Sequence, residues 1–173
     1  ETATSSTTTN ISEPSIQATK TTTDTDRIVD PGQEVSFTVG ARNVTGTRVS
    51  VAHQVGIVDT LPAGLTPLDG PGGSAVADGG TVASGGVWNA TARTITWPTV
   101  TSINAGSNVT RTYSVRVDDP AVSQAQLQNT VKATTSSLGA AHEAGGERSD
   151  PTTAPAYAGT AQVTLDIIGM DLA

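Results

Sequence analysis

The sequence predicts an all-β sandwich, and three observations lead to this fold class. Hydrophobic residues make up 35% of the chain and aromatic residues 3%, so a core must be built mostly from Val, Ile, Leu and Ala. Threonine is frequent, and Thr and Val together favour the half-buried, pleated surface of a sheet. The 18 glycines and 9 prolines are spread along the chain and mark many turns between short segments. With 173 residues, the chain is long enough for one domain with its own core.

The elements begin after a Ser/Thr-rich stretch, residues 1–13, which we interpret as a linker or an added edge strand. In the first expected strand, Ile16, Ala18 and Lys20 share one face, because side chains two apart point the same way. An acidic stretch and an Asp-Pro-Gly turn at 30–32 follow. The next strand has the clearest alternation in the sequence, with Val35, Phe37, Val39 and Ala41 on its inward face.

The middle of the chain is organised around a strand that runs into a turn. A series of valines leads to Asp59, which shares a face with Ile57 and Leu61. Pro62 and Gly64 are turn formers and end the strand. A carboxylate on such an apolar face is costly unless it is paired or protonated.

The Gly-rich segment 69–86 predicts a long mobile loop containing a short strand around 75–82. A hairpin over 87–97 follows, with its turn at 89–93. A further strand then buries one face, which carries Val109, Tyr113, Val115 and Val117.

The last part of the chain predicts one or two helical turns over 121–126, a loop excursion over 136–159 and a linker to a next module at 169–173. We place the domain itself at 14–168. Two strands frame the excursion, the first with Leu127, Asn129, Val131 and Ala133 on one face, and the second with Val163, Leu165 and Ile167.

Charge and composition exclude several classes of function. The net charge is −7 with no Lys/Arg cluster, which argues against nucleic acid and anionic membranes as partners. No apolar run is long enough to span a bilayer. The chain has no cysteine, which excludes disulfides and thiolate metal sites. His53 and His142 are isolated, and the aspartates lack the EF-hand spacing and are interpreted as solvated turns, so we expect no metal site and no cofactor.

Three polar residues, Lys20, Asp59 and Asn129, fall on the apolar faces of three separate strands. Each alone has an ordinary explanation: a snorkelling lysine, an aspartate at a turn, an asparagine at a strand start. Together, an amine, a carboxyl and a carboxamide facing inward can satisfy each other's burial. They can also react, because an amine in an apolar core has a depressed pKa and becomes a neutral nucleophile.

The reaction is an attack of the Lys20 amine on the side-chain carbonyl of Asn129. A protonated Asp59, hydrogen-bonded to that carbonyl, would polarise it and shuttle protons. Ammonia would leave, and an amide would join the two side chains. Proximity in a folded core makes the step effectively unimolecular. The reaction turns over once, so the protein is autocatalytic and not an enzyme in the ordinary sense.

The chain resembles the isopeptide-forming immunoglobulin-like domains of Gram-positive pilins and surface adhesins, the collagen-adhesin or fimbrial isopeptide-formation type. The resemblance covers 14–168 and is carried by Ala-Thr-Lys-Thr at 18–21, Val-Asp-Thr-Leu-Pro-Ala-Gly-Leu at 58–65 and Leu-Gln-Asn-Thr-Val-Lys-Ala at 127–133. It implies an immunoglobulin-like Greek-key sandwich. It also implies that Lys20 is the nucleophile, Asp59 the catalytic acid and Asn129 the acceptor.

By the same resemblance we expect a structural stalk module of a bacterial surface adhesin or pilus, located at the cell wall, whose partners are the neighbouring modules of its own polypeptide. Two alternatives stay open. One is a ligand-binding adhesin module that uses the loops 69–86 and 136–159 to bind host protein or glycan. The other is a plain spacer in which the three residues are only hydrogen-bonded.

Overall fold

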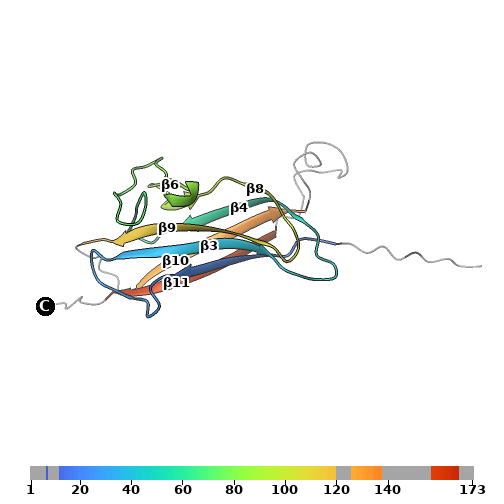
Figure 1. The fold of residues 1–173 in the computed structure, drawn as a ribbon, viewed down its shortest axis with the longest axis horizontal. Helices are drawn as coiled ribbons and strands as arrows, with labels where there is room; N and C mark the ends of the chain where they lie inside the picture. Colours follow the sequence, from blue (N-terminus) through green and yellow to red (C-terminus); the bar gives the residue numbers. More distant parts are fainter. Residues whose placement is uncertain (1–6, 8–11, 120–125, 138–156, 168–173) are drawn as a thin grey trace, which may run out of the picture.

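The computed structural model describes residues 7, 12–119, 126–137 and 157–167. Over these residues the chain forms two β-sheets packed face to face, and the one helical element among them is a 3₁₀ turn, η1, at Ala83–Gly85 (Figure 1). The all-β sandwich expected from the sequence is confirmed.

The strand order is that of an immunoglobulin-like sandwich. The first sheet has the order β1-β3-β9-β5, formed by β1 (Ile16–Thr22), β3 (Glu34–Asn43), β9 (Asn108–Val117) and β5 (Leu65–Pro67). The second has the order β2-β11-β10-β4-β7-β6, formed by β2 (Ile28–Val29), β11 (Tyr157–Ile167), β10 (Gln126–Ser136), β4 (Ala52–Thr60), β7 (Thr94–Thr96) and β6 (Val87–Asn89), and β8 (Val100–Ile103) also pairs with β4. The four strands of the first sheet reproduce the A-B-E-D sheet of that fold, and β4, β10 and β11 reproduce its C-F-G sheet.

The alternation predicted from sequence determines which side chains enter the core. Strand β10 buries every second residue from Leu127 to Thr135, and Asn129 lies on that buried face. Strand β3 does the same with Val35, Phe37, Val39 and Ala41. The few aromatic rings gather where these strands face each other: the ring centroid of Tyr113 is 5.7 Å from that of Phe37 and 5.7 Å from that of Trp97.

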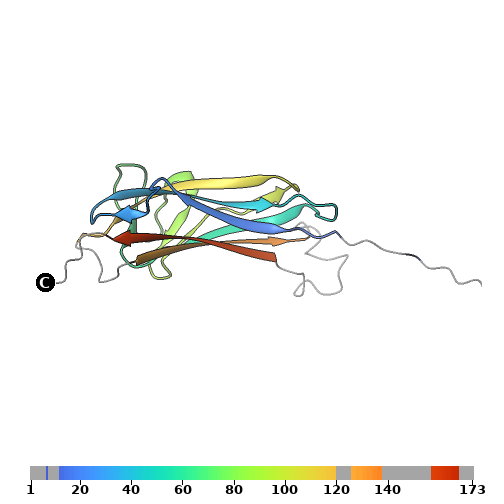
Figure 2. The same ribbon diagram turned by 90° about the horizontal axis from the view of Figure 1, so that it is seen from below.

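The two sheets approach each other closely along the edge formed by β1 and β11. A Cβ atom on Gly159 of β11 would lie 2.8 Å from the backbone nitrogen of Ala18 and 3.0 Å from the carbonyl oxygen of Ile16. Figure 2 shows β1 and β11 side by side, running the same way along the long axis. The absence of a side chain at Gly159 therefore lets the strand that carries Lys20 lie against the second sheet.

The Gly-rich segment differs from its prediction. In place of a strand over 75–82 there are only isolated bridges, Leu68 to Ala75 and Thr81 to Val87. The reason is turn chemistry: Gly79 takes a φ value of +77°, and the Gly80 amide donates to the Ala77 carbonyl at 2.9 Å, which makes a turn inside the expected strand. Backbone bonds join the segment to the hairpin, as between the Gly79 amide and the Trp88 carbonyl at 2.8 Å.

The hairpin itself is confirmed as β6 and β7. Several other expectations lie wholly or mostly outside the described residues: the linker or edge strand at 1–13, the helical turns at 121–126, most of the excursion at 136–159 and the linker at 169–173. Of these, Gln126 is described and begins β10. Within the described part of the chain, no helix has the length and apolar character needed to cross a membrane.

Candidate functional site

Lys20 brings an amine into the core from the first sheet. It lies near the end of β1, an edge strand, and its side chain is fully buried. The Nζ atom donates to Oδ1 of Asp59 at 2.6 Å and contacts Oδ2 of the same carboxyl group. The amine also lies 4.9 Å from the centroid of the Phe37 ring, in reach of a cation–π contact.

Asp59 receives that amine from the second sheet. It lies in β4 between two neighbouring strands, opposite Val131 of β10 and Ile95 of β7, and is completely buried. Its position follows from the alternation of β4, which buries Val55, Ile57 and Asp59 in turn.

The turn after Asp59 is held by Arg93. The backbone amide of Leu61 donates to the Arg93 carbonyl at 2.9 Å. In return, the Arg93 guanidinium donates to the carbonyls of Leu61, Pro62 and Leu65 at 3.1, 2.6 and 2.7 Å. This arginine in the β6–β7 turn therefore fixes the Leu-Pro-Ala-Gly-Leu segment and, with it, the end of β4.

Tyr113 connects the carboxyl group to the carboxamide. Its hydroxyl donates to Oδ2 of Asp59 and accepts a bond from Nδ2 of Asn129 at 2.8 Å. The same oxygen lies 3.4 Å from Nζ of Lys20. We call these four residues, Lys20, Asp59, Tyr113 and Asn129, the core polar cluster. It joins β1 and β9 of one sheet to β4 and β10 of the other.

Burial favours the uncharged forms of the cluster. It lowers the pKa of Lys20 to about 8, although the Asp59 carboxylate opposes this shift. Burial likewise raises the pKa of Asp59, against the opposing effects of Lys20 and Tyr113. The pKa of Tyr113 is raised well above its usual value, first by burial and then by the Asp59 charge. The phenol thus keeps its proton, while the amine and the carboxyl group can exchange theirs.

One polar atom of the Asn129 side chain, its carbonyl oxygen, lacks a hydrogen bond within the described structure. The amide nitrogen is hydrogen-bonded to Tyr113, but the carbonyl oxygen Oδ1 is buried and has no hydrogen-bond partner among the described residues. Such an orphaned acceptor is unusual in a protein core and calls for an explanation. If a nucleophile attacked Cγ, this oxygen is the atom that would take up the negative charge.

The three residues singled out from the sequence all lie between the sheets, with Lys20 bonded to Asp59 directly. The expected Asp59–Asn129 hydrogen bond is replaced by a connection through Tyr113. The register explains this: Asp59 lies opposite Val131, so Asn129 is its diagonal neighbour, and such pairs are typically about 7 to 8 Å apart. Alternation places Tyr113 on the inward face of its strand but does not predict its part in the cluster. The available signal was its hydroxyl, which needs a partner when buried.

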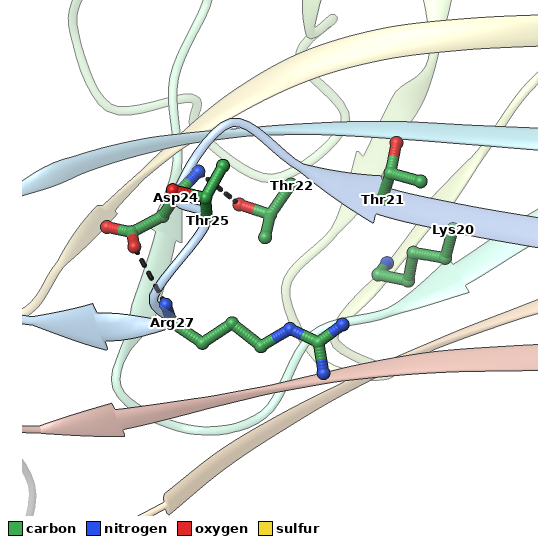
Figure 3. Close-up of a pocket in the computed structure, with 6 residues that line it drawn as sticks. All are labelled: Lys20, Thr21, Thr22, Asp24, Thr25 and Arg27. Carbon is green, nitrogen blue, oxygen red and sulfur yellow. Dashed lines mark hydrogen bonds between the residues drawn. The ribbon is translucent and has the colours of Figure 1, made fainter.

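A pocket of about 240 Å³ lies beside the end of β1 (Figure 3). In the loop that follows, Asp24 accepts a hydrogen bond from the backbone amide of Arg27 at 3.0 Å. The Lys20 side chain itself is fully buried, so its amine is shielded from bulk solvent. The residues that line the pocket are Lys20, Thr21, Thr22, Asp24, Thr25 and Arg27.

Among the residues that the structure describes, no three His, Cys, Asp or Glu side chains gather in a way that could hold a metal ion.

Comparison with known proteins gives structural likeness only. No family model matches the chain, and no curated protein matches it. The N-terminal domain of the Streptococcus gordonii adhesin Sgo0707 is similar, with a TM-score of 0.51 and 14% identity, over 88% of this chain and 32% of that one. The full-length major pilin SpaD of Corynebacterium diphtheriae has a TM-score of 0.48 and 12% identity, over 86% of this chain and 34% of that one.

A third similar structure, AvmM, which catalyses macrocyclization in alchivemycin A biosynthesis, has a TM-score of 0.46 and 10% identity, over 87% of this chain and 88% of that one. At such scores the likeness to SpaD and to AvmM carries no argument. The chain spans about a third of the length of the adhesin and pilin structures it matches. The likeness to the adhesin domain establishes the fold alone: this chain is a β-sandwich like that domain, as the resemblance implied.

Proposed function

We propose that this chain is a structural module of a bacterial cell-surface adhesin or pilus in which Lys20 and Asn129 become joined by an intramolecular isopeptide bond, promoted by Asp59. The observation that carries the proposal is the core polar cluster. A lysine, a carboxyl group and an asparagine are buried in one hydrogen-bonded group between two sheets, where an unreacted amine is costly. The adhesin-like fold supports the cellular role.

The chemistry follows from the protonation of the cluster. Asp59 takes a proton from Lys20, which leaves a neutral amine beside a carboxylic acid. The Nζ atom attacks Cγ of Asn129 and forms a C–N bond. The bond from Cγ to Nδ2 then breaks, and Nδ2 leaves as ammonia after it receives one proton. One proton lost from Nζ balances the one gained by the leaving nitrogen, so the cluster's charge does not change.

The test is the intact mass of the denatured chain. A cross-linked chain is lighter than its sequence requires by the mass of one ammonia. Asp59→Ala should restore the full mass, because it removes the proton carrier, whereas Asp69→Ala in a surface turn should keep the reduced mass. The cross-link closes a loop of roughly 110 residues, which stabilises the fold by about 4 to 5 kcal/mol if it acts as a disulfide does. Asp59→Ala should therefore melt at least roughly 10 °C lower.

A wild-type chain of full mass would refute the cross-link and leave the plain spacer. The ligand-binding alternative concerns the segment 69–86 and the excursion 136–159, and it would be tested by binding to host proteins and glycans after shortening each loop. We further propose that the module occupies 14–168, lies on the cell surface and has as partners the neighbouring modules of the same polypeptide.

A further inference from the structure

Tyr113 lies on the only hydrogen-bonded route from the acid to the leaving group within the described core. Asp59 and Asn129 are joined through the phenol oxygen, which donates to Oδ2 of Asp59 and accepts from Nδ2 of Asn129. The nitrogen that it contacts is the atom that must depart as ammonia. Asp59 itself bonds Lys20 and Tyr113, so the carboxyl group touches the nucleophile but not the leaving group.

Among the described residues, Tyr113 is the only group hydrogen-bonded to Nδ2 of Asn129. Asp59 and Asn129 are fully buried, and Tyr113 is 1% exposed, packed between the rings of Phe37 and Trp97. A hydroxyl group can give one proton and take another at the same time, which neither neighbouring ring can do. The orientation of the Asn129 amide also supports a role for Tyr113 at the leaving nitrogen. The amide turns its nitrogen toward the phenol, although this leaves Oδ1 without a partner among the described residues.

We propose that Tyr113 is a catalytic residue of the cross-linking reaction, a proton relay that protonates the leaving amide nitrogen of Asn129. The inference rests on the proposed isopeptide bond and adds a fourth residue to it. Asp59 enters this step as the carboxylic acid formed when it took a proton from Lys20, and the attack of Nζ on Cγ leaves a surplus proton on Nζ. The phenol then gives its proton to Nδ2, whose lone pair the attack has freed, and takes the Asp59 proton in the same movement. The freed Asp59 carboxylate takes the surplus Nζ proton, the Cγ–Nδ2 bond breaks and ammonia leaves, so the phenol and the carboxylic acid end in the forms they had before the attack.

The relay predicts a kinetic defect without loss of the fold. The chain is purified unfolded in denaturant and diluted into native buffer to start folding. Samples are quenched in acid at intervals, and their intact mass is measured. Tyr113→Phe keeps the ring between its aromatic neighbours and removes the hydroxyl. We expect mass loss at least about 100-fold slower than in the wild type, the usual scale of general acid catalysis. Tyr157→Phe, six pairs along the β10–β11 ladder from Asn129, is the matched control and should react at the wild-type rate.

A second measurement needs no variant. It distinguishes a tyrosine that relays protons from one that only holds Asp59 and Asn129 in place by hydrogen bonds. A relay moves two protons together, so the wild-type rate should fall along a curve as the deuterium fraction of the solvent rises. A straight line, or a Tyr113→Phe rate within a few-fold of wild type, would overturn the relay while the isopeptide bond stands. A wild-type chain that never loses ammonia would overturn both.

Discussion

At the scale of single residues, the core polar cluster gathers buried polar groups whose cost in free energy the proposed cross-link would lower. A buried amine and a buried carboxyl group each cost free energy, and an ion pair offsets that cost only when its remaining polar atoms are satisfied. Here Lys20 and Asp59 satisfy each other, but the carbonyl of Asn129 stays unbonded. An amide bond between Lys20 and Asn129 would replace a titratable amine by a neutral group. The burial that makes the amine costly is therefore also the driving force for its consumption.

The rate of cross-linking should have a bell-shaped dependence on pH. The reactive cluster holds one proton shared between Lys20 and Asp59. Above the lowered Lys20 pKa of about 8, that proton is lost and Asp59 has none to pass on, so the rate falls as pH rises. Below the raised pKa of Asp59, a second proton binds and the amine stays an ammonium, so the rate falls as pH drops. Refolding followed by intact mass from pH 4 to 10 measures this, and a rate that still climbs above pH 9 would contradict it.

At the scale of elements, the cluster depends on how accurately its four strands are held. Strand β1 contributes Lys20 from an edge, where fewer hydrogen bonds fix it, and its close packing on Gly159 of β11 compensates for this. Strand β4 is fixed beyond Asp59 by the Arg93 contacts to the following turn. A displacement of about 1 Å in either strand would separate reacting atoms that must meet at bonding distance.

Arg93→Lys should loosen this arrangement without touching the cluster. A lysine cannot bond three carbonyls with the geometry of a guanidinium, and lost bonds of this charged kind cost about 2 kcal/mol or more. We expect a lower melting temperature and slower ammonia loss. Arg111→Lys is the control, since its guanidinium bonds only the neighbouring Thr110 carbonyl, at 2.9 Å, among the described contacts. Equal effects of the two substitutions would show that the Arg93 contacts do not position Asp59.

The sequence predicts the strands wherever the hydrophobic alternation continues over many residues. For the site, it predicts only which face of its strand each residue lies on. Alternation placed Lys20, Asp59 and Asn129 inward, and all three are buried. It could not say that Asp59 lies opposite Val131, because strand register depends on turn geometry and on partners distant in sequence. The need for Tyr113 as the connecting group follows from that register. The short strand expected at 75–82 failed because the glycines there form turns.

At the scale of the whole molecule, the strand order decides what a cross-link would do under tension. Strand β1 begins at one end of the long axis and β11 finishes at the other, as Figures 1 and 2 show. A pull applied at the two ends would enter through β1 and reach Lys20 within a few residues. A bond to Asn129 would carry it directly into β10, the next-to-last strand. Residues 20–129, which include most of both sheets, would then form a closed loop that bears no force.

Single-molecule stretching measures this protection as released length. With the bond in place, only residues 14–19 and 130–168 of the module can extend, by at most about 160 Å at roughly 3.5 Å per residue. Asn129→Ala cannot form the bond and should release about 500 Å for the same stretch of chain. A reducing agent should change neither value, because an amide, unlike a disulfide, is not reducible. If the wild type also extends by about 500 Å, the closed loop does not exist, and the force-bearing role argued from the strand order fails with it.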